Sequence, residues 1–126
     1  MIKLLLVLSG CLCLTACYAR DDVYYLRNPA QLQSAMQQCQ FEQSQDAACQ
    51  NFNRLSGEFN RLANELRLSP QGFGLSILSL QQEMAQDKEK LSKQPTDKNL
   101  VAAIAVKQRD LAYRLAIVKV LEAPEA

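Results

Sequence analysis

The chain has 126 residues, with 14 Lys and Arg against 13 Asp and Glu, and it contains neither His nor Trp. Without His, imidazole metal ligands and His-based acid/base or triad catalysis are excluded. A nearly neutral chain with interspersed charges of both signs offers no electrostatic surface for nucleic acid or for an anionic membrane. We therefore expect a non-enzymatic protein with no catalytic residue, no metal site, no cofactor and no nucleic-acid partner.

The first residues have the composition of an export signal. Lys3 supplies a short positive region, and residues 4–14 form a mostly apolar run that is too short to span a bilayer. The motif Leu14-Thr15-Ala16-Cys17 follows, with small residues before a cysteine, as a lipoprotein signal peptidase requires. We therefore predict a signal peptide over residues 1–16 and a diacylglyceryl group on the Cys17 thiol, which would anchor the protein to a membrane.

Two other processing sites remain open. The motif Leu8-Ser9-Gly10-Cys11 also fits the lipoprotein pattern, but it would leave an apolar region of only about five residues, below the usual ~7–15. Cleavage after Ala19 would instead release a soluble secreted or periplasmic protein. If Cys17 is the first mature residue, the second is Tyr18 and not the Asp that retains lipoproteins in the inner membrane. We therefore expect a cell-envelope protein, lipid-anchored in the outer membrane and facing the periplasm or the cell surface.

The mature chain is short enough for a single domain. Removing residues 1–16 from the 126 leaves 110, which predicts one domain with a modest core. Residues 17–28 are expected to form a tether, and residues 29–123 a single helical-bundle domain.

Two cysteines of the mature chain are left to pair. With Cys17 acylated, only Cys39 and Cys49 remain, an even number in an oxidising compartment. Two thiols without His make a poor zinc site, and their spacing is not the C-x-x-C of redox enzymes. We predict a Cys39–Cys49 disulfide that joins the end of one helix to the start of the next.

The spacing of apolar residues predicts four helices and no strands. Asn28-Pro29 and Ser69-Pro70 are typical of an N-cap followed by a proline in the first turn. After each of these two sites, and after the two other polar breaks, apolar residues recur at intervals of three and four positions. The predicted helices cover about residues 29–40, 47–68, 70–93 and, after a cap at Thr96 or Asp97, up to about 122. Short connections make neighbours antiparallel, so the fold class is all-α, a small antiparallel helical bundle with a disulfide-stapled N-terminal helix.

The sequence also predicts the surroundings of several single residues. Asp87 occupies a position of the apolar seam of the third helix, so we expect that helix to fray or to meet solvent near its end. The charged residues of the fourth helix are expected to form exposed i,i+3 and i,i+4 pairs of small energetic value: Lys107, Arg109, Asp110 and Arg114. Gly57 costs ~1 kcal/mol relative to Ala within a helix, and a close helix crossing would explain it.

Residues 24–51, together with Cys17, resemble the entry-exclusion lipoproteins of conjugative plasmids, the EexN type. That family has a lipobox, an aromatic pair, an Asn/His-Pro, a leucine three residues later and two cysteines about ten residues apart. The corresponding residues here are Cys17, Tyr24-Tyr25, Asn28-Pro29, Leu32, Cys39 and Cys49. The resemblance implies an envelope protein of a type IV secretion or conjugation system that blocks redundant DNA transfer by contacting a channel component. This chain departs from that family by adding three long helices.

The aromatic start of the mature chain is the predicted partner contact: Tyr24, Tyr25 and Leu26. A stripe on the second or third helix that stays uncovered is the other candidate surface.

A second resemblance covers residues 68–74, which are similar to a stretch of small secreted proteins filed as resolvase-like endonucleases. No lysine of the chain has an acidic residue two places before it, so the acid-x-Lys half of such a metal site is missing. A pilotin-like lipoprotein that assembles an outer-membrane secretin is the third class considered.

Overall fold

The computed structural model describes residues 21–122, and it confirms the all-α class. Residues 21–27 are helical, and four longer helices follow: α2 (Pro29–Phe41), α3 (Ala47–Leu68), α4 (Pro70–Lys93) and α5 (Lys98–Glu122). The predicted signal peptide, the lipidation site at Cys17 and the alternative cleavage after Ala19 all lie outside the described residues. No helix within residues 21–122 is long and apolar enough to cross a membrane.

Polar side chains and prolines fix the helix starts. Asp46 accepts a hydrogen bond from the Cys49 amide at 2.8 Å, and Ser69 accepts one from the Gly72 amide at 3.1 Å. Asp97 accepts from two amides of the first turn of α5, those of Asn99 and Leu100. Each cap satisfies amides that have no partner within the helix, so the breaks in the sequence become the observed boundaries.

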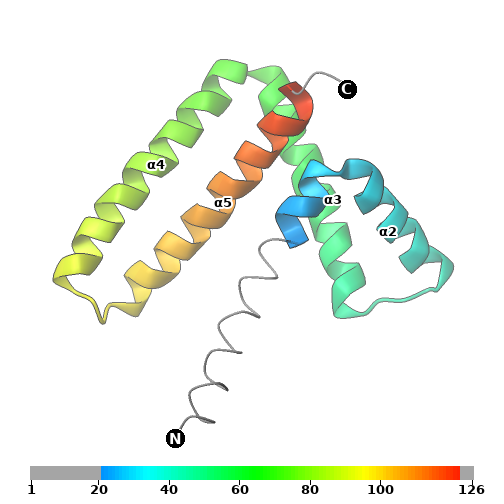
Figure 1. Cartoon of the computed structure of the whole chain (residues 1–126), viewed down its shortest axis with the longest axis horizontal. Helices are drawn as coiled ribbons and strands as arrows, with labels where there is room; N and C mark the ends of the chain where they lie inside the picture. Colours follow the sequence, from blue (N-terminus) through cyan, green and yellow to red (C-terminus); the bar gives the residue numbers. More distant parts are fainter. Residues whose placement is uncertain (1–20, 123–126) are drawn as a thin grey trace, which may run out of the picture.

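Two helical hairpins form the body of the molecule. Figure 1 shows α4 and α5 running side by side, while α2 and the first half of α3 lie apart from them on the other side. Helix α3 is the shared element, because it packs against α2, α4 and α5. The segment 21–27 lies where the two hairpins diverge (Figure 1).

The core joins side chains from every helical segment. Its largest fully buried members are one side chain of segment 21–27 and four of the longer helices: Leu26, Leu55, Leu62, Phe73 and Ile117. Fully burying a leucine or a phenylalanine is worth about 1.5–3 kcal/mol. The predicted tether over 17–28 is therefore corrected from residue 21 onward, since this part is helical and contributes Leu26 to the core.

Asn28 acts differently from the expected N-cap. Its side chain makes no hydrogen bond to the first turn of α2, and its Nδ2 instead donates to the Tyr24 carbonyl oxygen at 2.8 Å. Asn28 therefore closes the C-terminal end of segment 21–27, while its own backbone carbonyl accepts the first amides of α2.

Candidate partner-binding site

A polar network holds the start of the described chain against α3 and α5. The Tyr113 hydroxyl donates to Asp22 Oδ2 at 2.6 Å, and Arg54 Nη2 donates to the same oxygen at 3.0 Å. Asn51 Nδ2 donates to the other carboxylate oxygen at 2.9 Å, and Arg54 also donates to the Tyr113 hydroxyl at 3.1 Å. Asp22 thus binds three side chains from two helices, which fixes the position of the segment that bears it.

Burial and hydrogen bonding both favour the neutral form of the Tyr113 hydroxyl. Burial raises the pKa of Tyr113, and its hydrogen bond to Asp22 raises it further, while the bond from Arg54 opposes the shift. The hydroxyl is therefore a donor to Asp22 at neutral pH.

An aromatic series runs from the surface into the core beside this network. Tyr24 and Tyr25 meet edge to face with ring centroids 5.3 Å apart, and Tyr25 meets Phe52 of α3 in the same way at 4.9 Å. Edge-to-face pairs at these distances are favourable beyond their buried area. Tyr24 is the outer member of the series and is 51% exposed.

A shallow cavity of about 400 Å³ adjoins the inner end of this series. Its lining is mainly apolar and comes from segment 21–27 and the first turns of α3: Asp21, Asp22, Tyr25, Ala47, Ala48, Asn51 and Phe52. Mostly apolar cavities with a few polar groups are where small groups or partner side chains bind. Tyr24 and this cavity define the candidate site, which we call the N-terminal site.

The structure separates the three predicted partner residues. Tyr24 is exposed, and Tyr25 is half-buried against Phe52. Leu26 is 0% exposed, so the prediction that it contacts a partner is wrong for this fold. A helix turns about 100° per residue, which brings one of three successive side chains into the core and leaves another outside.

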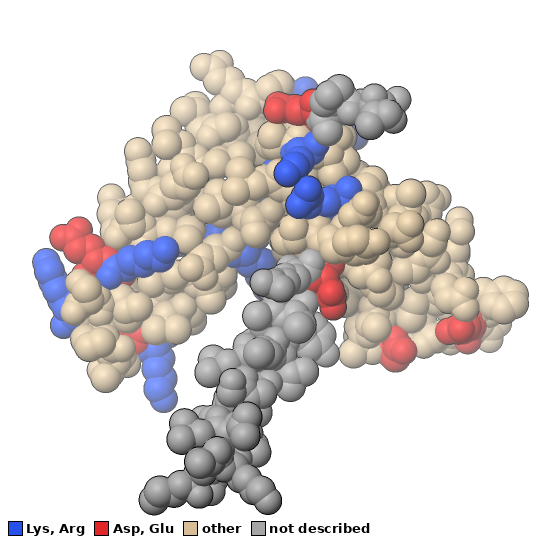
Figure 2. Space-filling model, in the orientation of Figure 1, with Lys and Arg blue, Asp and Glu red and all other residues tan. Residues whose placement is uncertain are grey.

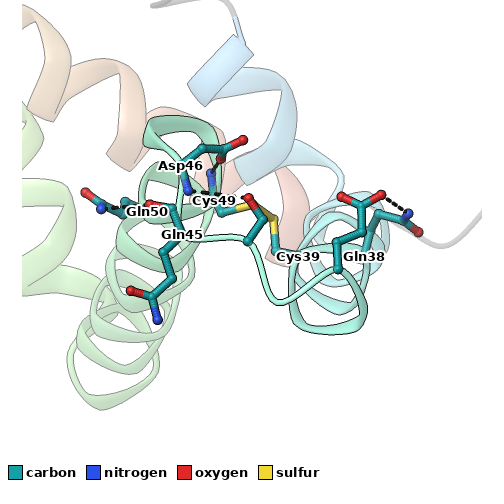
Figure 3. Close-up of a disulfide and its surroundings, with 8 residues drawn as sticks. Gln38, Cys39, Gln45, Asp46, Cys49 and Gln50 are labelled. Carbon is teal, nitrogen blue, oxygen red and sulfur yellow. Dashed lines mark hydrogen bonds between the residues drawn. A yellow bond between two sulfur atoms is a disulfide. The ribbon is translucent and has the colours of Figure 1, made fainter.

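The predicted Cys39–Cys49 disulfide is present and joins the end of α2 to the first turn of α3 (Figure 3). The two Cα atoms lie 5.8 Å apart. Hydrogen bonds of the connecting loop support the same turn, including the Asp46 cap on the Cys49 amide. Together with Leu32 in the core, the disulfide holds α2 against α3 next to the N-terminal site.

Sequence reasoning missed two buried charge clusters elsewhere in the molecule. Arg114 is 8% exposed, and its Nη1 donates to Glu65 at 2.8 Å and to Ser76 at 2.9 Å, which links α5 to α3 and α4. Its guanidinium also lies 5.0 Å from the centroid of the Phe73 ring. The expected i,i+4 pair with Asp110 is present at 3.2 Å, but the expectation that Arg114 is exposed is wrong.

Asp87 likewise does not meet solvent. It is 9% exposed and accepts a hydrogen bond from Lys107 Nζ at 2.6 Å, so the seam between α4 and α5 continues through an ion pair. The hydrogen bond to Asp87 raises the pKa of Lys107. The expected fraying of the third helix near its end is corrected, because α4 continues to Lys93. Glu83 lies 3.9 Å from the same ammonium group.

The expected reason for Gly57 is also corrected. A Cβ added at Gly57 would meet no atom within 4 Å, so no helix crossing requires this glycine. At Gly72 a Cβ would lie 2.7 Å from the Ser69 hydroxyl, so this glycine makes room for the cap of its own helix.

The chain matches no protein-family model, and neither the curated proteins nor the solved structures contain a significant match to it. Within residues 21–122, no three His, Cys, Asp or Glu side chains lie close enough together to hold a metal ion. The N-terminal site combines one exposed phenol ring with a mainly apolar cavity that the Asp21 carboxylate helps to line.

Proposed function

We propose that this chain is an exported envelope lipoprotein, anchored through Cys17, that acts as a protein-interaction module and contacts its partner through the N-terminal site. The observation that carries the proposal is the exposed Tyr24 ring, which contacts the Tyr25 ring that lines the cavity. Asp22 and Leu26 fix the segment that bears both rings. Tyr is enriched at the centres of protein interfaces, and a preorganised contact loses less entropy on binding.

The residues that resemble the EexN-type motif differ in how they pack. Tyr25, Leu32, Cys39 and Cys49 fix segment 21–27 and α2 to α3, while Tyr24 stays exposed. This arrangement supports a module in which the motif builds a platform and Tyr24 contacts the partner. We therefore propose that the partner is a component of a type IV secretion or conjugation system, and that the protein serves in entry exclusion or as an accessory of that system.

A conjugation assay with a photo-crosslinking arm tests this function. Cells that make the wild-type protein should receive the related plasmid less often than cells without it, and Tyr24→Ala should restore transfer. Losing a central interface tyrosine costs about 2 kcal/mol, or about 30-fold in affinity. Phe41→Ala is the matched control, because Phe41 is an exposed aromatic residue at the far end of α2.

The crosslinking arm places a photoreactive phenylalanine at position 24. Capture of a transfer-channel protein supports the proposal, whereas capture of an outer-membrane secretin favours the pilotin-like alternative. Unchanged transfer in wild-type cells, or equal effects of the Tyr24 and Phe41 substitutions, would contradict the proposed role of the N-terminal site.

A further inference from the structure

We propose that the end of the molecule formed by the turn between α4 and α5 rests on an anionic membrane surface when the protein is anchored. The inference depends on the lipid anchor at Cys17 in the proposed function. It adds the orientation of the body and the lipid chemistry that this end recognises.

The distance between anchor and body is short. Asp21 lies four positions after Cys17, and four residue steps span at most about 14 Å when fully extended. The body is already fixed at the next residue, because Asp22 accepts hydrogen bonds from Asn51, Arg54 and Tyr113. An acylated Cys17 would therefore keep the body at the membrane surface, with no long linker to let it move away.

The position of segment 21–27 selects the side that faces the membrane. In Figure 1 the blue segment begins on the side where the α4–α5 turn and the α2–α3 loop both lie, while the α3–α4 junction lies on the opposite side. A short connection from the start of this segment brings that side, with its two loops, closest to the lipid.

The two loops on this side differ in charge. The α4–α5 end carries four exposed lysines, and within residues 21–122 none of these lysines forms an ion pair: Lys88, Lys90, Lys93 and Lys98. The exposed Glu89 and the capping Asp97 offset two of these charges. The α2–α3 end instead carries Glu42 and Asp46. In the view of Figure 2 this end shows only acidic side chains, whereas the α4–α5 end shows basic side chains together with acidic ones.

Apolar side chains flank the basic end. Val101 and Val106 on the first half of α5 are each about half exposed, within an uninterrupted apolar run over residues 100–106. Lysines beside exposed apolar groups favour the headgroup region of an anionic membrane, because the ammonium groups are attracted to the lipid charges and the apolar side chains enter the interface. The total charge of the chain does not reveal this attraction, because it does not show that four lysines with no ion pair among the described residues lie together at one end of the fold.

Headgroup quenching on the anchored protein tests the orientation. The full mature protein is extracted from membranes, its lipid is confirmed by intact mass, and it is placed in vesicles of phosphatidylethanolamine with phosphatidylglycerol that carry a headgroup spin label. A fluorophore is attached at Ser92→Cys, near the α4–α5 turn, or at Gln71→Cys, at the other end of the same helix. The 24 residues of α4 extend about 36 Å, so the two positions report different heights above the lipid.

We expect the fluorophore at position 92 to be quenched at least roughly twofold more strongly than the one at position 71. The reason is that α4 is longer than the distance over which contact quenching acts. Lys90→Gln with Lys93→Gln should bring this ratio toward one, as should vesicles of phosphatidylcholine alone. The control Arg67→Gln with Lys119→Gln removes two charges from the opposite end and should leave the ratio unchanged. Equal quenching at both positions, or stronger quenching at 71, on a protein of lipidated mass overturns the orientation. An unlipidated mass overturns the anchor instead.

Discussion

Arg114 shows how one buried residue joins three helices. Its guanidinium group contacts Glu65 on α3, Ser76 on α4 and Asp110 on its own helix, and it lies over the ring of Phe73. The planar fork of arginine suits several acceptors at fixed angles, which the single ammonium of lysine does not.

Arg114→Ala should therefore lower the free energy of unfolding by about 2 to 3 kcal/mol, because it leaves the carboxylate and hydroxyl partners without their shared donor. Arg114→Lys should recover only part of this loss. Chemical denaturation followed by circular dichroism measures both. Arg109→Ala, an exposed substitution on the same helix, should change stability by less than about 0.5 kcal/mol. An Arg114→Ala midpoint equal to that of Arg109→Ala would contradict the assigned contacts.

Tyr113 links the fold to pH. Since its pKa is raised in the folded protein, the stability contributed by the neutral hydroxyl is complete below the unfolded pKa of about 10, and it is lost as the pH rises through the folded value. Tyr113→Phe should cost about 1 kcal/mol at neutral pH and should flatten the fall in stability above pH ~10. Denaturation curves across this pH range compare the two proteins. Parallel pH profiles would show that the Asp22 bond has no such role.

At the scale of the element, a helix glycine offers a direct test. Gly57 lies inside α3, is exposed, and has open space where a Cβ would be. Gly57→Ala should raise the free energy of unfolding by about 0.5 to 1 kcal/mol, because alanine restricts the unfolded chain and fits the helix without contact. A lower thermal midpoint would mean that another surface packs against this position.

The disulfide holds a short element that has little stability of its own. Helix α2 has only 13 residues and one buried side chain, Leu32, so it depends on its contacts with α3. Cys39→Ser should lower stability by about 2 to 3 kcal/mol on loop-entropy grounds, since the bridge closes a loop with a sequence separation of 10. Thermal unfolding of protein purified from the periplasm or envelope measures this. An unchanged midpoint would show that the bridge does not form in the cell.

At the scale of the whole molecule, the helix bounds follow from local signals, whereas the polar contacts between distant helices do not. The helices at 47–68 and 70–93 begin and end as predicted, because Asp46, Ser69 and Pro70 act within one turn of their own position. These ion pairs and hydrogen bonds were not predicted, because their partners lie far apart in sequence. Lys107 and Asp87 are 20 positions apart, and Tyr113 and Asp22 are 91 positions apart.

The N-terminal site was predictable only in part for the same reason. Tyr24 and Tyr25 stand out as aromatic residues in a polar stretch, but segment 21–27 is too short for its apolar spacing to predict which side is buried. The helical phase that buries Leu26 is set by contacts with α3 and α5, and these come from residues far along the chain.

The account depends most on export with lipid on Cys17, and intact mass spectrometry of the membrane fraction measures this directly. The wild-type protein should have the mass of residues 17–126 plus a diacylglyceryl modification, and Cys11→Ser should have the same gain in mass. Cys17→Ser should lack it. A lipid-sized gain that survives Cys17→Ser, a chain that starts at residue 20, or an unprocessed protein with reduced thiols in the cytosol would contradict the central claim.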